Sequence, residues 1–244
     1  MSLETLPATL ESTRRLIRTV DALTDEELLA DSLLPCWSRG HVVAHLARNA
    51  EGIADALNGL AQGEEVPMYA SQEARDRDIE ELVEQGPAAM RDALMSGCHR
   101  FQEAVENLPE ACWTGSFPRV PGGQRFEVAD IVATRRREVE VHHADLGAQY
   151  SPDDWPDDFV VELLDTVVVD HADDGPFVVQ ATDLDRRWSV GLRPDPDAGD
   201  HLQVVSGTGG DLGWWLTGRG QGGGLAADPG GLPKIGPWRR TPAR

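Results

Sequence analysis

Apolar residues recur at helical spacing through the first 150 residues and predict four long helices. The expected helices cover residues 8–23, 38–61, 87–108 and 127–149, and a short helical turn follows Thr24. The segment between the second and third of these helices contains Gly63 and Pro67 and is predicted to be a polar connection. Four long helices with short or medium links indicate a four-helix bundle, assigned here to residues 1–150.

The pattern changes at Ser151, where alternating apolar positions and short helical stretches replace the long helices. Residues 151–244 are predicted to form a small α+β (α/β) domain. Its expected elements are a helix at 157–171, strands at 176–180, 187–192 and 201–206, and a helix at 208–218 that ends at Gly218. The residues after Arg219 are rich in Gly and Pro. The predicted fold class is therefore α plus α+β.

Composition and charge narrow the possible functions. The chain has 244 residues, of which 40% are hydrophobic, enough for at least one core. Its 42 acidic and 22 basic residues give a net charge of −20, which disfavours nucleic-acid and membrane-surface partners. An anionic substrate would need cations supplied locally by its site. No run of roughly 20 apolar residues is present, and the first residues lack the features of a secretory signal.

The three cysteines, Cys36, Cys98 and Cys112, are widely separated and form no CxxC pair. They are predicted to be buried or half-buried thiols of a cytoplasmic protein. No basic residue accompanies them in a reactive motif, so none is expected to act as a nucleophile.

The segment RREVEVHHADL carries the first candidate chemistry. Glu138 and His142 are four residues apart on one face of the fourth helix, and Arg135 shares that face. Three polar groups turned into a bundle need partners, because burying them unpaired is costly. Taken alone, the segment fits a buried ion network of Glu138 with Arg135 or His142.

The segment GHVVAHLARNA on the second helix adds His41, His45 and Asn49 at successive four-residue steps. Two histidines and one carboxylate from two helices form a ligand set that holds zinc and leaves a fourth position open. His45 lies between apolar positions that face the bundle interior. The spacing leaves His41 open in place of His45, and His143 in place of His142.

The glycine-rich segment GTGGDLGWWLTGRGQGGG lacks the features of a phosphate-binding loop. Its Arg219 either satisfies the last carbonyls of a short helix or offers a guanidinium to a carboxylate. The other histidines (His99, His171 and His201) are expected to have surface or capping roles. The Trp214–Trp215 pair is expected to belong to a core.

Four segments together resemble the mycothiol-dependent maleylpyruvate isomerases of the DinB-like metal-dependent superfamily: WSRGHVVAHLARNA, GEEVPMYASQEAR, RREVEVHHADLGA and VVSGTGGDLGWWLTGRG. The resemblance implies a DinB-type four-helix bundle followed by a small α/β domain. It places the metal ligands on His45, Glu138 and His142, with zinc as the expected metal. It assigns Arg219 to substrate binding. His143 departs from the smaller or apolar residue expected there, and the tail after Arg219 matches poorly.

The resemblance also implies a reaction, the cis–trans isomerisation of maleylpyruvate to fumarylpyruvate in gentisate-type degradation of aromatic compounds. A zinc-bound thiolate from mycothiol adds to the double bond, rotation follows, and elimination restores the alkene. The dicarboxylate substrate would be anchored by Arg219 first and Arg135 second. The alternatives are a zinc- and mycothiol-dependent S-transferase and a non-catalytic protein of the same fold. Mycothiol and a small dicarboxylate are the expected partners, and a monomer is compatible with the sequence.

Overall fold

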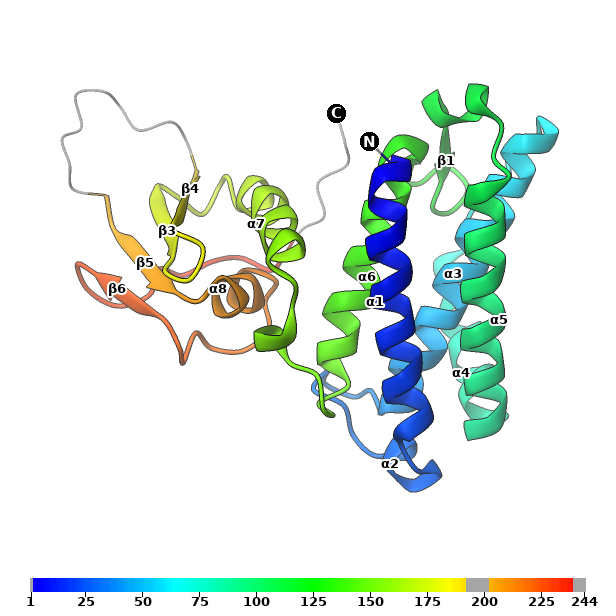
Figure 1. The fold of residues 1–244 in the computed structure, drawn as a ribbon, viewed down its shortest axis with the longest axis horizontal. Helices are drawn as coiled ribbons and strands as arrows, with labels where there is room; N and C mark the ends of the chain where they lie inside the picture. The colour runs from blue at the N-terminus through cyan, green and yellow to red at the C-terminus, as the bar shows by residue number, and fades with distance from the viewer. Residues whose placement is uncertain (1, 192–201, 239–244) are drawn as a thin grey trace. The chain divides into compact units, whose positions relative to one another are not determined.

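A computed structural model describes residues 2–191 and 202–238 of the protein. The chain divides after Ser151 into two compact units, one helical and one with a sheet. Figure 1 shows the helical unit in blue to green and the second unit in yellow-green to red. Because each unit has its own core, they are described separately.

The helical unit is built on four long helices, as predicted. Their bounds are α1 Ser2–Ala22, α3 Arg39–Gln62, α5 Pro87–Glu106 and α6 Ile131–Asp145. The helix α3 packs against α5 and α6, and α1 packs against both α6 and α5. Two clusters of buried apolar side chains fill the interior, one centred on Leu57 and Phe101 and the other on Leu46 and Leu94. The site described below lies on the two helices α3 and α6.

The start of α3 is fixed by a reciprocal cap. The Ser38 hydroxyl accepts from the backbone N–H of His41 at 3.3 Å, and a ring nitrogen of His41 accepts from the backbone N–H of Ser38 at 3.2 Å. The helix ends at Gly63, which adopts a left-handed conformation with φ 78°. These two signals set the register in which α3 presents its polar residues to the interior.

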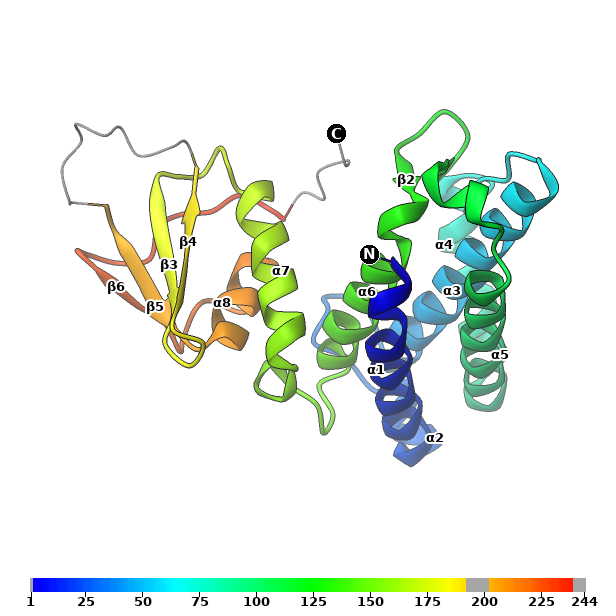
Figure 2. The same cartoon turned by 45° about the horizontal axis from the view of Figure 1, so that its top comes forward.

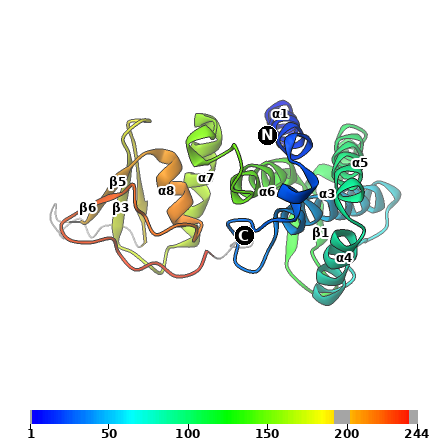
Figure 3. The same cartoon turned by 90° about the horizontal axis from the view of Figure 1, so that it is seen from below.

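The polar connection predicted after residue 62 is wrong in part, because residues Gln72–Glu84 form a helix, α4. Its N-cap is Ser71, whose hydroxyl accepts from the backbone N–H of Ala74 at 3.0 Å. Only Ala74, Ile79 and Leu82 are buried in this otherwise charged segment, so its apolar stripe is too thin to stand out in the sequence. The helix α4 packs beside α3 and α5 (Figure 3).

Other boundaries also differ from the prediction. The fourth helix begins at Ile131 and not at residue 127, because β2 Arg125–Glu127 pairs antiparallel with β1 Ser116–Pro118. Short 3-10 helices occupy Glu110–Thr114 (η1) and Val128–Asp130 (η2), and α2 covers Asp25–Leu29. The hairpin therefore contains residue 127 and η2 contains residues 128–130, all of which the helical pattern had assigned to the fourth helix.

The second unit contains a four-stranded sheet with the order β4-β3-β5-β6. Its elements are η3 Pro152–Asp154, α7 Asp157–Asp170, β3 Phe177–Ala181, β4 Arg186–Val190, β5 Val204–Gly207, α8 Gly209–Leu216 and β6 Ala226–Asp228. β3 and β5 run parallel, and the other two pairs are antiparallel. Figure 2 shows α7 and α8 on one face of the sheet. The strand β6 was not predicted, and residues 192 and 201, the predicted ends of two strands, lie outside the described residues.

The burial predicted for the cysteines and for the Trp214–Trp215 pair is found for some of these residues and not for others. Cys98 is buried and Cys112 is half-buried, but Cys36 is exposed, in a turn with φ 66°. Both tryptophans belong to α8, where Trp215 is buried and Trp214 is half-buried. Within the described ranges, no helix combines the length and the apolar character needed to cross a membrane.

Candidate metal centre in the helical unit

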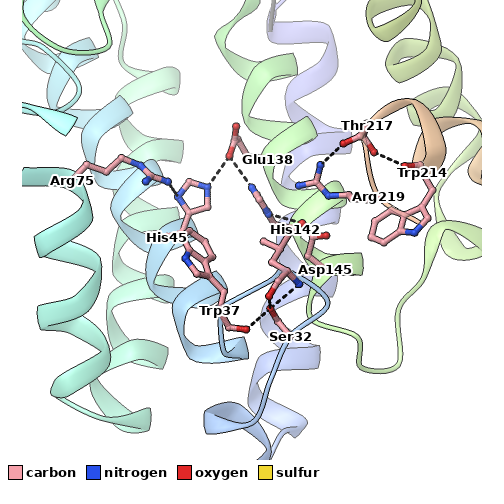
Figure 4. A network of polar contacts seen from close by, with 11 residues as sticks. Ser32, Trp37, His45, Arg75, Glu138, His142, Asp145, Trp214, Thr217 and Arg219 are labelled. Carbon is pink, nitrogen blue, oxygen red and sulfur yellow. Dashed lines mark hydrogen bonds and ion pairs between the residues drawn. The ribbon is translucent and has the colours of Figure 1, made fainter. Parts of the chain in front are cut away.

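Three side chains from two helices converge inside the helical unit. His45 comes from α3, and Glu138 and His142 come from α6. The Nε2 atom of His45 lies 3.0 Å from Oε2 of Glu138, and Nε2 of His142 lies 3.5 Å from the same oxygen. One ligand atom from each residue lies within 4.8 Å of the others. Figure 4 shows the three side chains turned toward one another. Two imidazoles and a carboxylate at this separation form a suitable set for one divalent cation.

A buried carboxylate orients His142. The Nδ1 atom of this ring lies 2.8 Å from Oδ2 of Asp145, whose side chain is fully buried. Nδ1 therefore donates a proton to the carboxylate, and Nε2, on the side of Glu138, is the nitrogen that a metal would use. Burial alone would lower the pKa of His142, but the hydrogen bonds to Asp145 and Glu138 outweigh burial and raise it. A carboxylate behind a histidine is the usual outer support of a metal ligand.

His45 has a different partner behind it. Its Nδ1 atom lies 3.0 Å from Nη2 of Arg75, and its ring lies 5.7 Å from the ring of Trp37. Burial lowers the pKa of His45 to about 4, although Glu138 acts in the opposite direction. The ring is therefore neutral at neutral pH, and a neutral ring is the form that can ligate a metal.

The two alternative histidines lie elsewhere. The ring of His41 takes part in the cap of α3, and its Nε2 lies 3.2 Å from Glu80. His143 stacks on Tyr150 with ring centroids 3.7 Å apart, and its Nε2 lies 2.8 Å from the Thr19 hydroxyl. Neither belongs to the cluster of convergent ligand atoms.

Arg135, the second predicted substrate anchor, has interior partners. It is 1% exposed, and its Nη1 donates to Oδ1 of Asn49 at 2.6 Å. Its Nη2 lies 3.5 Å from Sγ of Cys98. The expectation that no basic group accompanies the cysteines is therefore wrong for Cys98, because the bundle brings together residues that are distant in sequence.

Arg219 belongs to the second unit and lies just after α8. Its Nη1 donates to the carbonyl of Thr217 at 3.0 Å, and its backbone N–H donates to the carbonyl of Trp214, also at 3.0 Å (Figure 4). Its guanidinium carbon lies 6.0 Å from the Trp214 ring and 5.8 Å from the Trp238 ring. The helix-capping contact foreseen as one of its two roles is present.

Two isolated histidines differ in their surroundings. His99 has an exposed side chain 3.3 Å from Glu103. His171 terminates α7 but is buried, between Asp174 at 2.6 Å and the carbonyl of Leu216 at 2.6 Å. His171 thus joins α7 to the end of α8. This buried connection was not predicted, because His171 was expected to have a surface or capping role. His201 lies outside the described residues.

Three residues near His45 or its neighbours were not predicted from the sequence: Arg75, Tyr69 and Arg119. Tyr69 is buried, with the guanidinium carbons of Arg75 and Arg119 at 5.9 and 5.5 Å from its ring centroid. Burial raises the pKa of Tyr69, against the opposing charges of the two arginines. The available signal was the segment GEEVPMYASQEAR, which contains both Tyr69 and Arg75. Because α4 was not predicted, nothing in the spacing placed Arg75 near His45.

A bundle of four long helices followed by a small sheet-containing unit is the architecture of the DinB-like class that includes the maleylpyruvate isomerases. The particular family follows from residues 9–147, which match the mycothiol maleylpyruvate isomerase N-terminal domain. This match covers more than half of the chain, and the protein belongs to that family.

Two solved structures agree with this assignment. One is a crystal structure of the mycothiol-dependent maleylpyruvate isomerase, and the other is a histidine-to-alanine mutant of the same enzyme. Each is 25% identical to this chain with a TM-score of 0.85, and the alignment covers 98% of this chain and 97% of the other. No curated protein matched the sequence.

Proposed function

We propose that this protein is a mycothiol-dependent isomerase that converts maleylpyruvate to fumarylpyruvate, with a zinc ion held by His45, Glu138 and His142. The observation that carries the proposal is the set of three convergent ligand atoms, supported behind His142 by the buried Asp145. The family match supports the choice of reaction.

The chemistry needs a temporary single bond, because a carbon–carbon double bond does not rotate readily. A thiolate adds to one alkene carbon, and the electron pair moves onto the neighbouring carbonyl. After rotation, the electron pair returns and the same thiolate leaves, so the thiol is not consumed. Zinc, when bound, supplies the positive charge that keeps the thiol cofactor deprotonated at neutral pH.

The residues of the chain have separate tasks in this scheme. His45 and Glu138 approach from two different helices, so the packing of α3 on α6 sets the spacing of the ligands. Asp145 keeps a proton on Nδ1 of His142 and so keeps Nε2 available. Only three protein ligands converge in the described residues, which leaves a coordination position for an exchangeable group.

The substrate is a dicarboxylate and the protein has a net charge of −20, so arginines must bind its carboxylates. Arg219 is proposed as one anchor, because it is only half-buried and lies beside two aromatic rings. Arg135 is the second candidate, but it would have to give up Asn49 and Cys98 in a fully buried position. Arg219 is therefore the stronger candidate of the two.

The proposed thiol is external. Cys98 and Cys112 are buried or half-buried and Cys36 is an exposed turn residue, and none of them contributes a ligand atom to the candidate centre. Three cysteines without a disulfide are consistent with the proposed location in the reducing cytoplasm. A variant that lacks all three cysteines, if folded, should retain mycothiol-dependent turnover.

The experiment is to follow the ultraviolet absorbance of maleylpyruvate with zinc-loaded protein, with and without mycothiol, and to identify the product by NMR. The proposal predicts fumarylpyruvate only when mycothiol is present, with no net loss of thiol. His142→Ala should abolish turnover, whereas the neighbouring change His143→Gln should not. Stoichiometric consumption of mycothiol would indicate an S-transferase. If maleylpyruvate does not react and no mycothiol is consumed, both the isomerase and the S-transferase are rejected.

A further inference from the structure

A cluster of positive charge lies behind His45 in the helical unit. Arg75, from α4, and Arg119, from the β1–β2 hairpin, both have their guanidinium groups near the ring of Tyr69. Gln72 and Asp76 connect them, since Arg119 donates to Gln72 at 2.6 Å and Gln72 donates to Asp76 at 2.9 Å. In a chain of net charge −20, two guanidinium groups on one buried ring make a local site for an anion.

Arg75 has donor capacity that the protein does not use. Its Nη1 binds the exposed carboxylate of Asp76 at 2.7 Å, and its Nη2 binds Nδ1 of His45 at 3.0 Å. Its Nε–H is buried and makes no hydrogen bond with the described residues. The Arg75 side chain is 13% exposed, so the group is largely removed from solvent. Buried guanidinium N–H groups bind carboxylates strongly, often through two parallel hydrogen bonds.

The contact between Arg75 and His45 depends on where the ring carries its proton. A guanidinium only donates, so Nδ1 of His45 accepts here and the proton of the neutral ring is on Nε2, toward Glu138. If Nε2 held a metal, its lone pair would be used and the proton of a neutral ring would be on Nδ1, which could then not accept from Arg75. Nη2 of Arg75 would be available to another acceptor. Figure 4 shows the Arg75 guanidinium beside the ring of His45.

We infer that Arg75 is a substrate-binding residue that donates Nη2–H and Nε–H to one carboxylate of the dicarboxylate once a metal occupies the centre. Arg119 adds a second positive charge near the Tyr69 ring. The inference rests on the proposed function for the identity of the substrate, but carboxylate binding itself does not require turnover. It provides an anchor within the helical unit, where the sequence analysis had offered only Arg135.

The experiment measures binding to zinc-loaded protein without thiol by calorimetry. The probes are maleate, a cis-dicarboxylate, and maleamate, in which one carboxylate is an amide. Wild type should bind maleate more tightly than maleamate. Arg75→Met should weaken maleate binding by about tenfold or more and reduce the difference between the two probes to about twofold. Arg75→Lys should be intermediate, because it keeps the charge but loses the planar fork.

The matched control is Arg77→Met. Arg77 lies on the same helix, its side chain is 61% exposed, and its Nε lies 3.8 Å from the carboxylate of Glu81. It should bind both probes as wild type does. If Arg75→Met keeps the wild-type preference for maleate, or if wild type itself shows no preference, the inference is overturned.

Zinc affinity separates substrate binding from mere support of His45. By competition with a chelator, Arg75→Met should bind zinc as tightly as wild type or more tightly, because a nearby positive charge has been removed. A loss of zinc affinity would assign Arg75 to holding His45 and would overturn the inference.

If the protein fails to isomerise maleylpyruvate but Arg75→Met still loses its preference for maleate, only the proposed function fails. Turnover by wild type with unchanged maleate binding in Arg75→Met would overturn only the inference.

Discussion

The helix α6 carries one glutamate and one histidine on each of two faces, and the surroundings of the two glutamates differ. Glu138 and His142 meet His45 of α3, whereas Glu140 and His143 lie against α1 and Tyr150. The two glutamates are only two residues apart in the sequence, and both are buried. The sequence RREVEVHHAD does not by itself distinguish the two pairs.

The partners of each carboxylate make the difference. Glu140 accepts from the Ser12 hydroxyl, from Nη2 of Arg15 at 2.7 Å and from the Tyr150 hydroxyl. Burial, together with the charge of Glu140, raises the pKa of Tyr150, so its hydroxyl remains a donor. Glu140 thus accepts from two hydroxyls and from the permanently charged guanidinium of Arg15, which disfavours a cation beside it. Glu138 faces two imidazole nitrogens, which can become acceptors for a metal. A buried carboxylate therefore indicates a metal site only when its partners can also be ligands.

The largest effect should follow from removing a histidine ligand. His142→Ala should reduce zinc-dependent turnover on the order of 1,000-fold, because the ion would lose one of three protein ligands. Metal content and initial rate are measured on the same preparation. His143→Ala, one residue along the helix, should retain its zinc. Equal zinc content in His142→Ala and wild type would contradict the assignment of the ligands.

A change on the other face should act on stability instead. Glu140→Ala removes the acceptor shared by Ser12, Arg15 and Tyr150 and should lower the free energy of unfolding by about 3–5 kcal/mol. Chemical denaturation of the metal-free protein measures this. The fraction that remains folded should still bind zinc. Unchanged stability accompanied by a loss of zinc would reverse the roles given to the two faces.

Asp145→Asn should have a smaller effect on the metal. A neutral amide holds the Nδ1–H of His142 less strongly, so zinc affinity should fall about 10- to 100-fold in chelator competition. The control is Asp174→Asn, which alters a similar contact to His171 at 2.6 Å in the second unit. The two variants should differ in zinc affinity, and equal affinities would remove the supporting role given to Asp145.

The smallest effect is expected for His143→Phe. Phenylalanine can still stack on Tyr150 but cannot bond the Thr19 hydroxyl, so the loss of stability should be about 1 kcal/mol. Thermal unfolding and zinc content are the readouts. A substantial loss of zinc in this variant would bring His143 back as a ligand.

Helical periodicity was enough to place Glu138 and His142 on one face and to put His45 among the apolar positions of α3, although it left His41 open. Both inferences depend only on spacing within one helix. The choice of His45 over His41 gains a physical reason in the structure, since the His41 ring is used in the cap of α3. The metal itself stays a prediction.

The rest of the site depends on contacts between distant segments. Arg15 and Glu140 are 125 residues apart, so the sequence could not show that Glu140 is saturated with donors. Arg75 reaches His45 only because α4 forms, and three buried side chains in a charged segment gave too little signal to predict that helix. The burial of His171 likewise depends on the end of α8, 45 residues away.

The most direct test of the central claim, that the Glu138 face of α6 binds the metal, is the zinc content per chain of two isosteric variants. Glu138→Gln and Glu140→Gln are purified in parallel, equilibrated with zinc, freed of excess ion and measured by elemental analysis. The account predicts near one zinc per chain in wild type and in folded Glu140→Gln, and almost none in Glu138→Gln. Full zinc content in Glu138→Gln, or its loss from a folded Glu140→Gln, would contradict it.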